Sequence, residues 1–251
     1  MFKVPKWSMI DNPFSYQHVT DDMLLITVGD SWTYGDSLGN TKVRNGIDDT
    51  DYRLSHVYGH LMSKELNSSW VNLALPGGSN ALMLSWLDTF LNNIILPYKE
   101  IVCVITLTES GRHEELQMID RTLITQQEVL EDILANTYYD IKVLEKKHEK
   151  IKFVVGHNFT DGNNSTIDLC NMTWLEAMLD KEIQNNTYIV VSDHIEQMNY
   201  ERRFPDVFDI IDRAEARIDL LDSCVHCYKE DSRHPNETGH AIWADYLLDR
   251  L

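Results

Sequence analysis

Residues Met23–Gly39 read MLLITVGDSWTYGDSLG, and this stretch decides the fold that the sequence predicts. Met23–Val28 is a continuous apolar run rich in branched side chains, which is typical of a strand buried on both faces of a parallel sheet. The run ends at Gly29-Asp30-Ser31, where glycine permits a sharp turn. The turn leaves the Ser31 hydroxyl at the carboxyl end of a central strand, where open α/β sheets bind their ligands.

The composition indicates an ordinary globular chain. It has 251 residues, of which 43% are hydrophobic and 25% charged, enough for one large or two small α/β domains. The formal net charge of −18 argues against nucleic acid and anionic membranes as partners, because both need a basic patch. No stretch has the length and apolarity of a signal peptide or a transmembrane segment. We therefore expect a protein that is cytoplasmic or released without a classical signal.

Apolar patterns along the rest of the chain predict alternating strands and helices. The predicted strands are 70–75, 101–107, 151–156 and 188–192, and the predicted helices are 52–66, 172–180, 236–251 and one or two within 113–150. A further helix is expected after Ser79 or Asn80, either of which can cap it, with an apolar stripe from Met83 to Ile94. This order predicts a parallel sheet with right-handed crossovers. We expect a single domain over 1–251, with helical or loop insertions near 113–150 and 193–230. The oligomeric state stays open.

The segment Asp231-Ser232-Arg233-His234-Pro235 precedes the last predicted helix. Pro235 pushes the residue before it out of the helical region, so His234 is expected on an extended corner. Asp231 can curl back to Nδ1 of the imidazole, which leaves Nε2 free to accept a proton from a hydroxyl. The alternative is a helix-entry loop with two solvated polar residues.

Loops that follow the predicted strands meet at one edge of a parallel sheet. Ser31 follows the first strand, a glycine turn containing Gly77 follows the second, and the polar residues 108–112 follow the third. The loop that carries His234 can reach the same edge. A nucleophile, a backbone N–H donor, a polar loop and an Asp/His pair are the parts that acyl transfer needs.

These residues resemble the SGNH (GDSL-type) hydrolase family. The matching blocks are Gly29-Asp30-Ser31-Trp32 followed by Gly35, Asn72 through Gly77, and 231–235, and they cover nearly the whole chain in order and spacing. The resemblance implies an α/β fold: a three-layer α/β/α sandwich around a mostly parallel, flavodoxin-like sheet. It also implies ester hydrolysis through an acyl-serine intermediate, without a cofactor. Ser31 is then the nucleophile, His234 the general base and Asp231 the group that orients the imidazole.

The third block departs from the family pattern. The family carries an asparagine after the third strand whose amide helps to hold the oxyanion, and the matching residue here is Ser110. The remaining expected donors are the backbone N–H groups of Ser31 and Gly77. Losing one good donor costs about a hundredfold to a thousandfold in rate. Ser110, Arg112 or another loop donor replaces the asparagine, or the enzyme is slow or suited to another substrate. Arg112 alternatively forms a surface salt bridge.

The residues around Ser31 carry two further alternatives. A literal Gly-Asp-Ser-Leu at 35–38 follows a turn rather than a buried strand, so we expect Ser37 to be a loop residue. Trp32 and Tyr34 flank the nucleophile, and either line a pocket for a sugar or acyl group or pack in the core.

The cysteines are expected to be reduced, with Cys103 as a core thiol. Cys224-x-x-Cys227 raises the possibility of zinc, but no second Cys/His pair at metal spacing follows. We therefore expect no metal.

The substrate that we expect is a short-chain acyl ester, most often acetyl, on a carbohydrate. A lipid or lysophospholipid esterase or an acyltransferase is the alternative, although no amphipathic segment with a basic face is present to reach a membrane. A second alternative is a non-catalytic glycan-binding or structural protein that keeps the fold, which the altered third block motivates.

Overall fold

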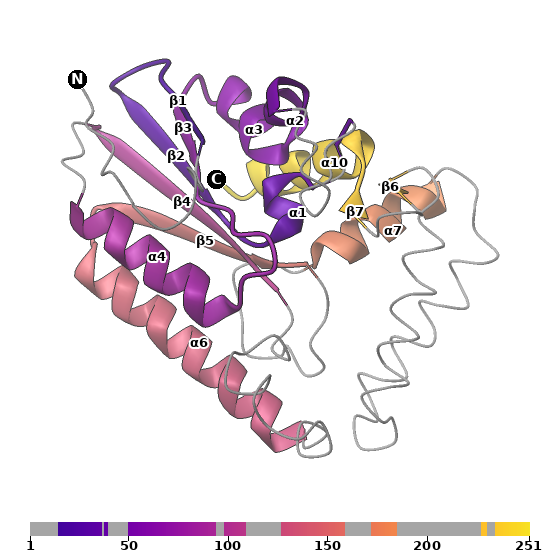
Figure 1. The fold of residues 1–251 in the computed structure, drawn as a ribbon. Helices are drawn as coiled ribbons and strands as arrows, with labels where there is room; N and C mark the ends of the chain where they lie inside the picture. The colour runs from indigo at the N-terminus through magenta and orange to yellow at the C-terminus, as the bar shows by residue number, and fades with distance from the viewer. Residues whose placement is uncertain are drawn as a thin grey trace.

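Five strands form the main sheet, and helices cover both of its faces (Figure 1). The computed structural model describes residues 15–36, 38–39, 50–93, 98–108, 127–158, 172–184, 227–229 and 234–251. The strands are β1 (Ser15–Gln17), β2 (Met23–Val28), β3 (Ser69–Asn72), β4 (Glu100–Leu107), β5 (Ile151–His157), β6 (Tyr228–Lys229) and β7 (His234–Pro235). The helices are α1 (Ser31–Tyr34), α2 (Thr50–His56), α3 (Tyr58–Glu65), α4 (Asn80–Asn93), α6 (Gln127–Lys147), α7 (Trp174–Gln184) and α10 (Glu237–Leu248).

The strand order explains why the site forms where it does. The order is β1-β3-β2-β4-β5, with β2 to β5 parallel and β1 antiparallel on the edge beside β3. The chain passes from β2 outward to β3 and then returns across β2 to β4. The strand order therefore reverses between β2 and β4, and ligands of open α/β sheets bind outside the carboxyl ends of the strands at such a point. The predicted mostly parallel, flavodoxin-like sheet is confirmed.

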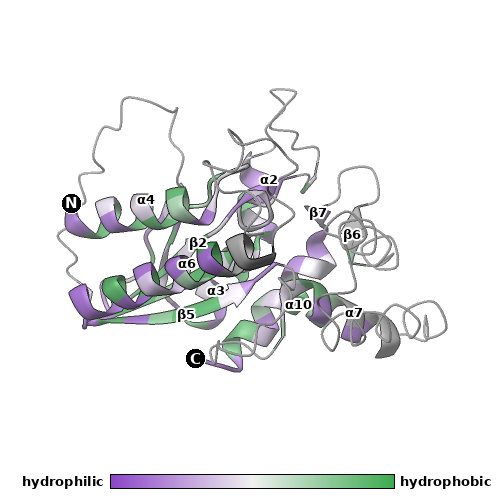
Figure 2. Cartoon of the chain, turned by 90° about the horizontal axis from the view of Figure 1, so that it is seen from below, coloured by the Kyte–Doolittle hydropathy of each residue, from purple (hydrophilic) through white to green (hydrophobic). Residues whose placement is uncertain are grey.

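Side chains that alternate along the central strands build two cores, one on each face of the sheet. Leu25 of β2 packs with Val102 and Val104 in the core beneath α3, α7 and α10, whereas Leu24 and Ile26 point into the core beneath α4 and α6. In Figure 2, α4 and α6 carry both hydrophobic and hydrophilic residues, as expected of helices that cover a sheet. The three-layer sandwich is therefore present.

The structure divides the predicted helix 52–66 into α2 and α3. Val57 between them is extended, at φ −69° and ψ 146°. The N–H of Tyr58 donates to Nδ1 of His240 at 3.2 Å instead of continuing the α2 hydrogen-bond ladder. A tertiary acceptor, which the apolar periodicity does not reveal, thus breaks the helix.

Other predictions have mixed outcomes. The short edge strand β1 was not predicted, and the predicted strand 188–192 lies outside the described residues.

Cys103 is a buried free thiol, as expected, and Cys227 is also free and buried. None of the described helices combines the length and apolarity needed to cross a lipid bilayer. The single domain over 1–251 and the insertions near 113–150 and 193–230 remain predictions.

Candidate active site

The turn after β2 places Ser31 at the first residue of α1. Asp30 caps this helix, because its Oδ1 accepts a hydrogen bond of 2.9 Å from the N–H of Trp32. A Cβ on Gly29 would lie 2.0 Å from Oγ1 of Thr33, so α1 folds back too closely for any residue but glycine. Ser31 is 8% exposed at the carboxyl edge of the sheet.

The Asp30 carboxylate joins the ends of three strands. Besides capping α1, it accepts hydrogen bonds from Nδ2 of Asn158 at 2.9 Å and from Oγ1 of Thr108 at 2.8 Å. Asn158 follows β5 and Thr108 follows β4. The side chain of Asn80 in turn binds both the N–H and the carbonyl of Thr108. Sequence reasoning missed this support, although polar residues directly after buried strands were a signal for it.

His234 lies beside Ser31, more than 200 residues along the chain. Its Nε2 is 2.9 Å from Oγ of Ser31, and Figure 1 shows β7 next to α1. The side chain of Asn236 caps α10. The backbone N–H of Asn236 donates to the carbonyl of Cys227 at 3.0 Å. The structure therefore brings the two predicted residues together, with the imidazole on an extended segment just before the last helix.

Asp36 is a carboxylate near this imidazole, and sequence reasoning missed it. Its Oδ2 lies 3.8 Å from Nε2 of His234, in ion-pair range but beyond hydrogen-bond distance. The cap of α1 explains the placement: Gly35 is left-handed at φ 82°, and the N–H of Asp36 donates back to the carbonyl of Ser31 at 2.9 Å. The turn thus returns the chain to the side of the nucleophile.

His240 is a buried histidine one turn into α10. Its Nδ1 accepts the hydrogen bond from Tyr58, and its ring meets the Trp174 ring edge to face at 5.0 Å. Burial lowers the pKa of His240 to about 3, with smaller contributions from the charges of His234 and His56. His240 is therefore neutral at ordinary pH and adds no positive charge beside the site.

The structure decides between the two alternatives for Trp32. It is 2% exposed and packs edge to face against Trp174, with ring centroids 5.4 Å apart. The substrate-binding role considered for Trp32 is thus corrected to a core role. The motif residue Asn72 is also structural, since its amide donates to the carbonyl of Thr33 and accepts from the N–H of Ala74.

Gly77 lies in the turn after β3, and its role as a backbone donor remains a prediction. It is exposed, has φ 75°, and a Cβ on it would meet no atom within 4 Å. Asp231, Ser110, Arg112 and Ser37 lie outside the described residues, so their expected roles remain predictions. Within the described part of the chain, no three His, Cys, Asp or Glu side chains gather as a metal site would require.

Comparison with known proteins finds similarity in fold at low sequence identity. No protein family and no curated protein matches the chain by sequence. A family two carbohydrate esterase from Cellvibrio japonicus aligns over 91% of this chain and 59% of its own, at 13% identity and a TM-score of 0.43. An α/β hydrolase enzyme from the metagenome of Lake Arreo aligns over 91% of this chain and 94% of its own, at 17% identity and a TM-score of 0.41.

A phospholipase A1 from Streptomyces albidoflavus aligns over 92% of this chain and 99% of its own, at 12% identity and a TM-score of 0.40. The chain thus spans about three fifths of the carbohydrate esterase and nearly the full length of the other two.

Proposed function

We propose that this protein is a serine esterase of the SGNH type, which cleaves esters through an acyl-serine intermediate. The observation that carries the proposal is the 2.9 Å contact between Oγ of Ser31 and Nε2 of His234, at the edge of the sheet where the strand order reverses between β2 and β4. A hydroxyl in hydrogen-bond contact with an imidazole is the pair that nucleophilic catalysis needs.

In the proposed reaction, Oγ of Ser31 attacks the ester carbonyl carbon while Nε2 of His234 accepts the hydroxyl proton. The imidazolium then gives this proton to the leaving alcohol, and the acyl group remains on Ser31. Water attacks the acyl-serine in the second half of the cycle, with His234 again accepting the proton. We propose that Asp231 accepts a hydrogen bond from Nδ1 of His234 and so holds the ring in the tautomer whose Nε2 is unprotonated.

The oxyanion that forms on the carbonyl oxygen needs hydrogen-bond donors. We assign this task to the backbone N–H groups of Ser31 and Gly77, with Ser110 as a third donor. Support comes from the position of Ser31 at the start of α1 and from the exposure of Gly77 in the turn after β3. Fixed donors of this kind stabilise the charge that develops in the transition state.

The substrate that we propose is a short acyl ester on a carbohydrate. The support is an aromatic pair on α2: the Tyr52 ring stacks on the ring of the half-buried His56 at 4.1 Å between centroids, and Tyr52 is 38% exposed. The Tyr52 hydroxyl donates to Oε1 of Glu237, three residues after His234. An aromatic ring that a hydrogen bond fixes in place, with polar neighbours near the site, suits a sugar ring, which is apolar on its faces and polar at its edge.

Labelling with a fluorophosphonate probe tests the proposal. We expect covalent modification of Ser31 in the wild type and hydrolysis of p-nitrophenyl acetate, with both lost in Ser31→Ala. His234→Ala should lower both rates by at least a hundredfold. Ser85, exposed on α4, provides a control, since Ser85→Ala should leave labelling unchanged.

The competing functions predict different results. A glycan-binding protein without activity would leave wild-type Ser31 unlabelled. A lipid esterase would be labelled, but would prefer long acyl chains and lysophospholipids in a panel that also contains acetylated sugars. Transfer of the acyl group to an added sugar, in place of release as free acid, would indicate an acyltransferase.

A further inference from the structure

We infer that Asp36 is an electrostatic partner of His234 that stabilises the imidazolium formed during catalysis. The inference rests on the proposed function, and it assigns a task to a carboxylate that the Ser-His-Asp scheme does not use. The 3.8 Å between Oδ2 of Asp36 and Nε2 of His234 is the observation that raises it.

The geometry distinguishes Asp36 from the acid of a catalytic triad. A triad carboxylate binds Nδ1 and fixes the tautomer. Asp36 instead faces Nε2, the nitrogen that Ser31 also contacts. It cannot select the tautomer from that side. It can stabilise the positive charge that appears on the ring after Ser31 has given up its proton, because opposite charges at this distance attract without a hydrogen bond.

The fold holds Asp36 in this place. The N–H of Asp36 bonds to the carbonyl of Ser31, so the nucleophile and the carboxylate belong to the same capped turn. Gly35 makes the turn possible, since a Cβ there would lie 2.3 Å from Cγ1 of Val57 and its φ is positive. The carboxylate is thus set by backbone geometry rather than by a long, mobile side chain.

The surroundings allow the attraction to act. The side chains of His234 and Asp36 are 19% and 16% exposed, so solvent screens the pair only in part. Further titratable groups among the described residues at this end of α10 are His240, which is neutral, His56 of α2, and Glu237, which accepts a hydrogen bond from Tyr52. The predicted acid Asp231 lies outside the described residues, and we expect it on the Nδ1 side of the ring.

Asp36→Asn tests the inference, because it removes the charge and keeps the shape. We expect kcat/KM for p-nitrophenyl acetate to fall about tenfold on the neutral plateau, since the charged intermediate loses a stabilising partner. The acid limb of the rate profile should also move to lower pH. A purely structural role would lower the rate without moving the acid limb.

Two further variants provide controls. Asp36→Glu keeps the charge and should retain the wild-type acid limb. Asp51→Asn removes one negative charge from an exposed position in the first turn of α2 and should change neither rate nor profile. Added salt should move the acid limb of the wild type downward by more than that of Asp36→Asn, because salt screens the rest of the net charge of −18 in both proteins.

An NMR titration of the His234 ring separates this inference from the proposed function. The ring of Asp36→Asn should titrate at lower pH than that of the wild type, whether or not either protein cleaves esters. An active wild type with identical titration midpoints in the two proteins would overturn the role of Asp36 and leave the esterase intact. An inactive, unlabelled wild type with shifted midpoints would overturn the esterase, and with it the catalytic task of Asp36, and would leave Asp36 as an electrostatic partner of His234.

Discussion

At the scale of single residues, Asp30 connects several segments of the site in addition to capping α1. Its carboxylate receives hydrogen bonds from Trp32, Thr108 and Asn158, all buried. Asp30→Ala would leave these donors without their acceptor and would remove the cap of α1. We expect a loss of about 3 kcal/mol in the free energy of unfolding, measured by urea denaturation. Asp140→Ala, on the exposed side of α6, should change it by less than about 0.5 kcal/mol.

The same variant should affect catalysis through Ser31. Because the nucleophile is the first residue of the helix that Asp30 caps, loosening that turn misplaces Oγ relative to His234. Labelling of Ser31 in the folded fraction should therefore slow at least tenfold. Wild-type labelling in a destabilised Asp30→Ala protein would mean that α1 holds its position without the cap.

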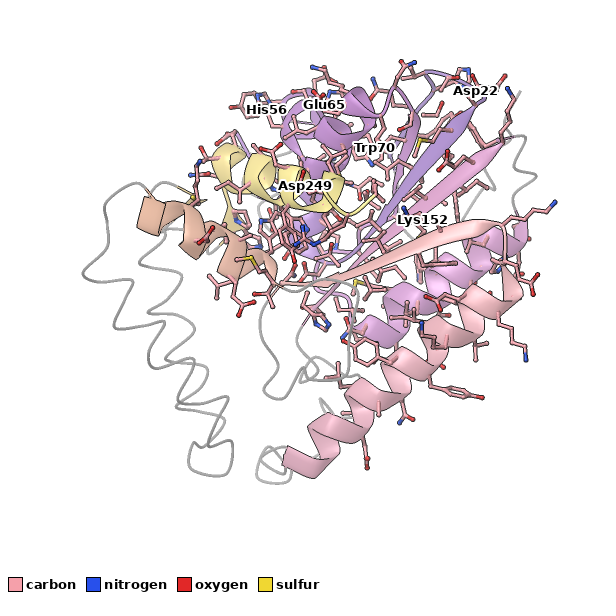
Figure 3. All side chains as sticks on the ribbon, turned by 180° about the vertical axis from the view of Figure 1, so that it is seen from behind. Asp22, His56, Glu65, Trp70, Lys152 and Asp249 are labelled. Atoms are coloured by element: carbon pink, nitrogen blue, oxygen red, sulfur yellow. The ribbon has the colours of Figure 1, made fainter. Side chains whose placement is uncertain are left out.

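At the scale of elements, α2 contacts both α1, which carries Ser31, and α10, which follows His234. Arg53 donates to the carbonyl of Tyr34 at 2.9 Å and lies over the Tyr34 ring, while Tyr52 on the same helix reaches Glu237 of α10. Figure 3 shows His56 at the end of α2, on the same side of the sheet as α10. The helix that carries the Tyr52–His56 pair is thus bound to α1 through Arg53 and to α10 through Tyr52.

Tyr52→Ala is expected to weaken recognition of the sugar and to spare the chemistry. KM for an acetylated oligosaccharide should rise about fivefold, the worth of one aromatic contact, with kcat unchanged. Turnover of p-nitrophenyl acetate, which has no sugar, should not change. Tyr139, 69% exposed on α6 across the sheet, supplies the control in Tyr139→Ala. Equal kinetics of the two variants on the oligosaccharide would remove the support for a carbohydrate substrate.

The sequence reveals the elements better than their ends and their contacts. Apolar periodicity and the motif blocks predict β2 to β5, α4, α10 and the pairing of Ser31 with His234, since burial and loop position follow from local pattern. The same reasoning misses Asp36, because its approach to the imidazole depends on the left-handed Gly35 that ends α1. It also misses the break at Val57, because the acceptor for Tyr58 lies 182 residues away on His240.

At the scale of the whole molecule, the buried His240 should make the fold sensitive to acid. Its pKa is about 3 in the folded protein against 6.5 ordinarily, mainly because burial disfavours the charged ring. As the pH falls below 6.5, His240 binds a proton in the unfolded chain but not in the folded one. The free energy of unfolding therefore falls with pH until about pH 3. At pH 5, which is 1.5 units below the ordinary value, this one group should cost about 2 kcal/mol.

The net charge of −18 acts in the opposite direction, since protonating carboxylates relieves repulsion within the folded protein. A matched variant is therefore needed to isolate His240. His240→Gln loses the titration and keeps a polar side chain, so its free energy of unfolding should fall by about 2 kcal/mol less than that of the wild type between pH 7.5 and pH 5. Urea denaturation at the two pH values measures both differences. Parallel losses in the two proteins would show that His240 takes up its proton without unfolding the chain, and that its burial beside Tyr58 and Trp174 is looser than the contacts indicate.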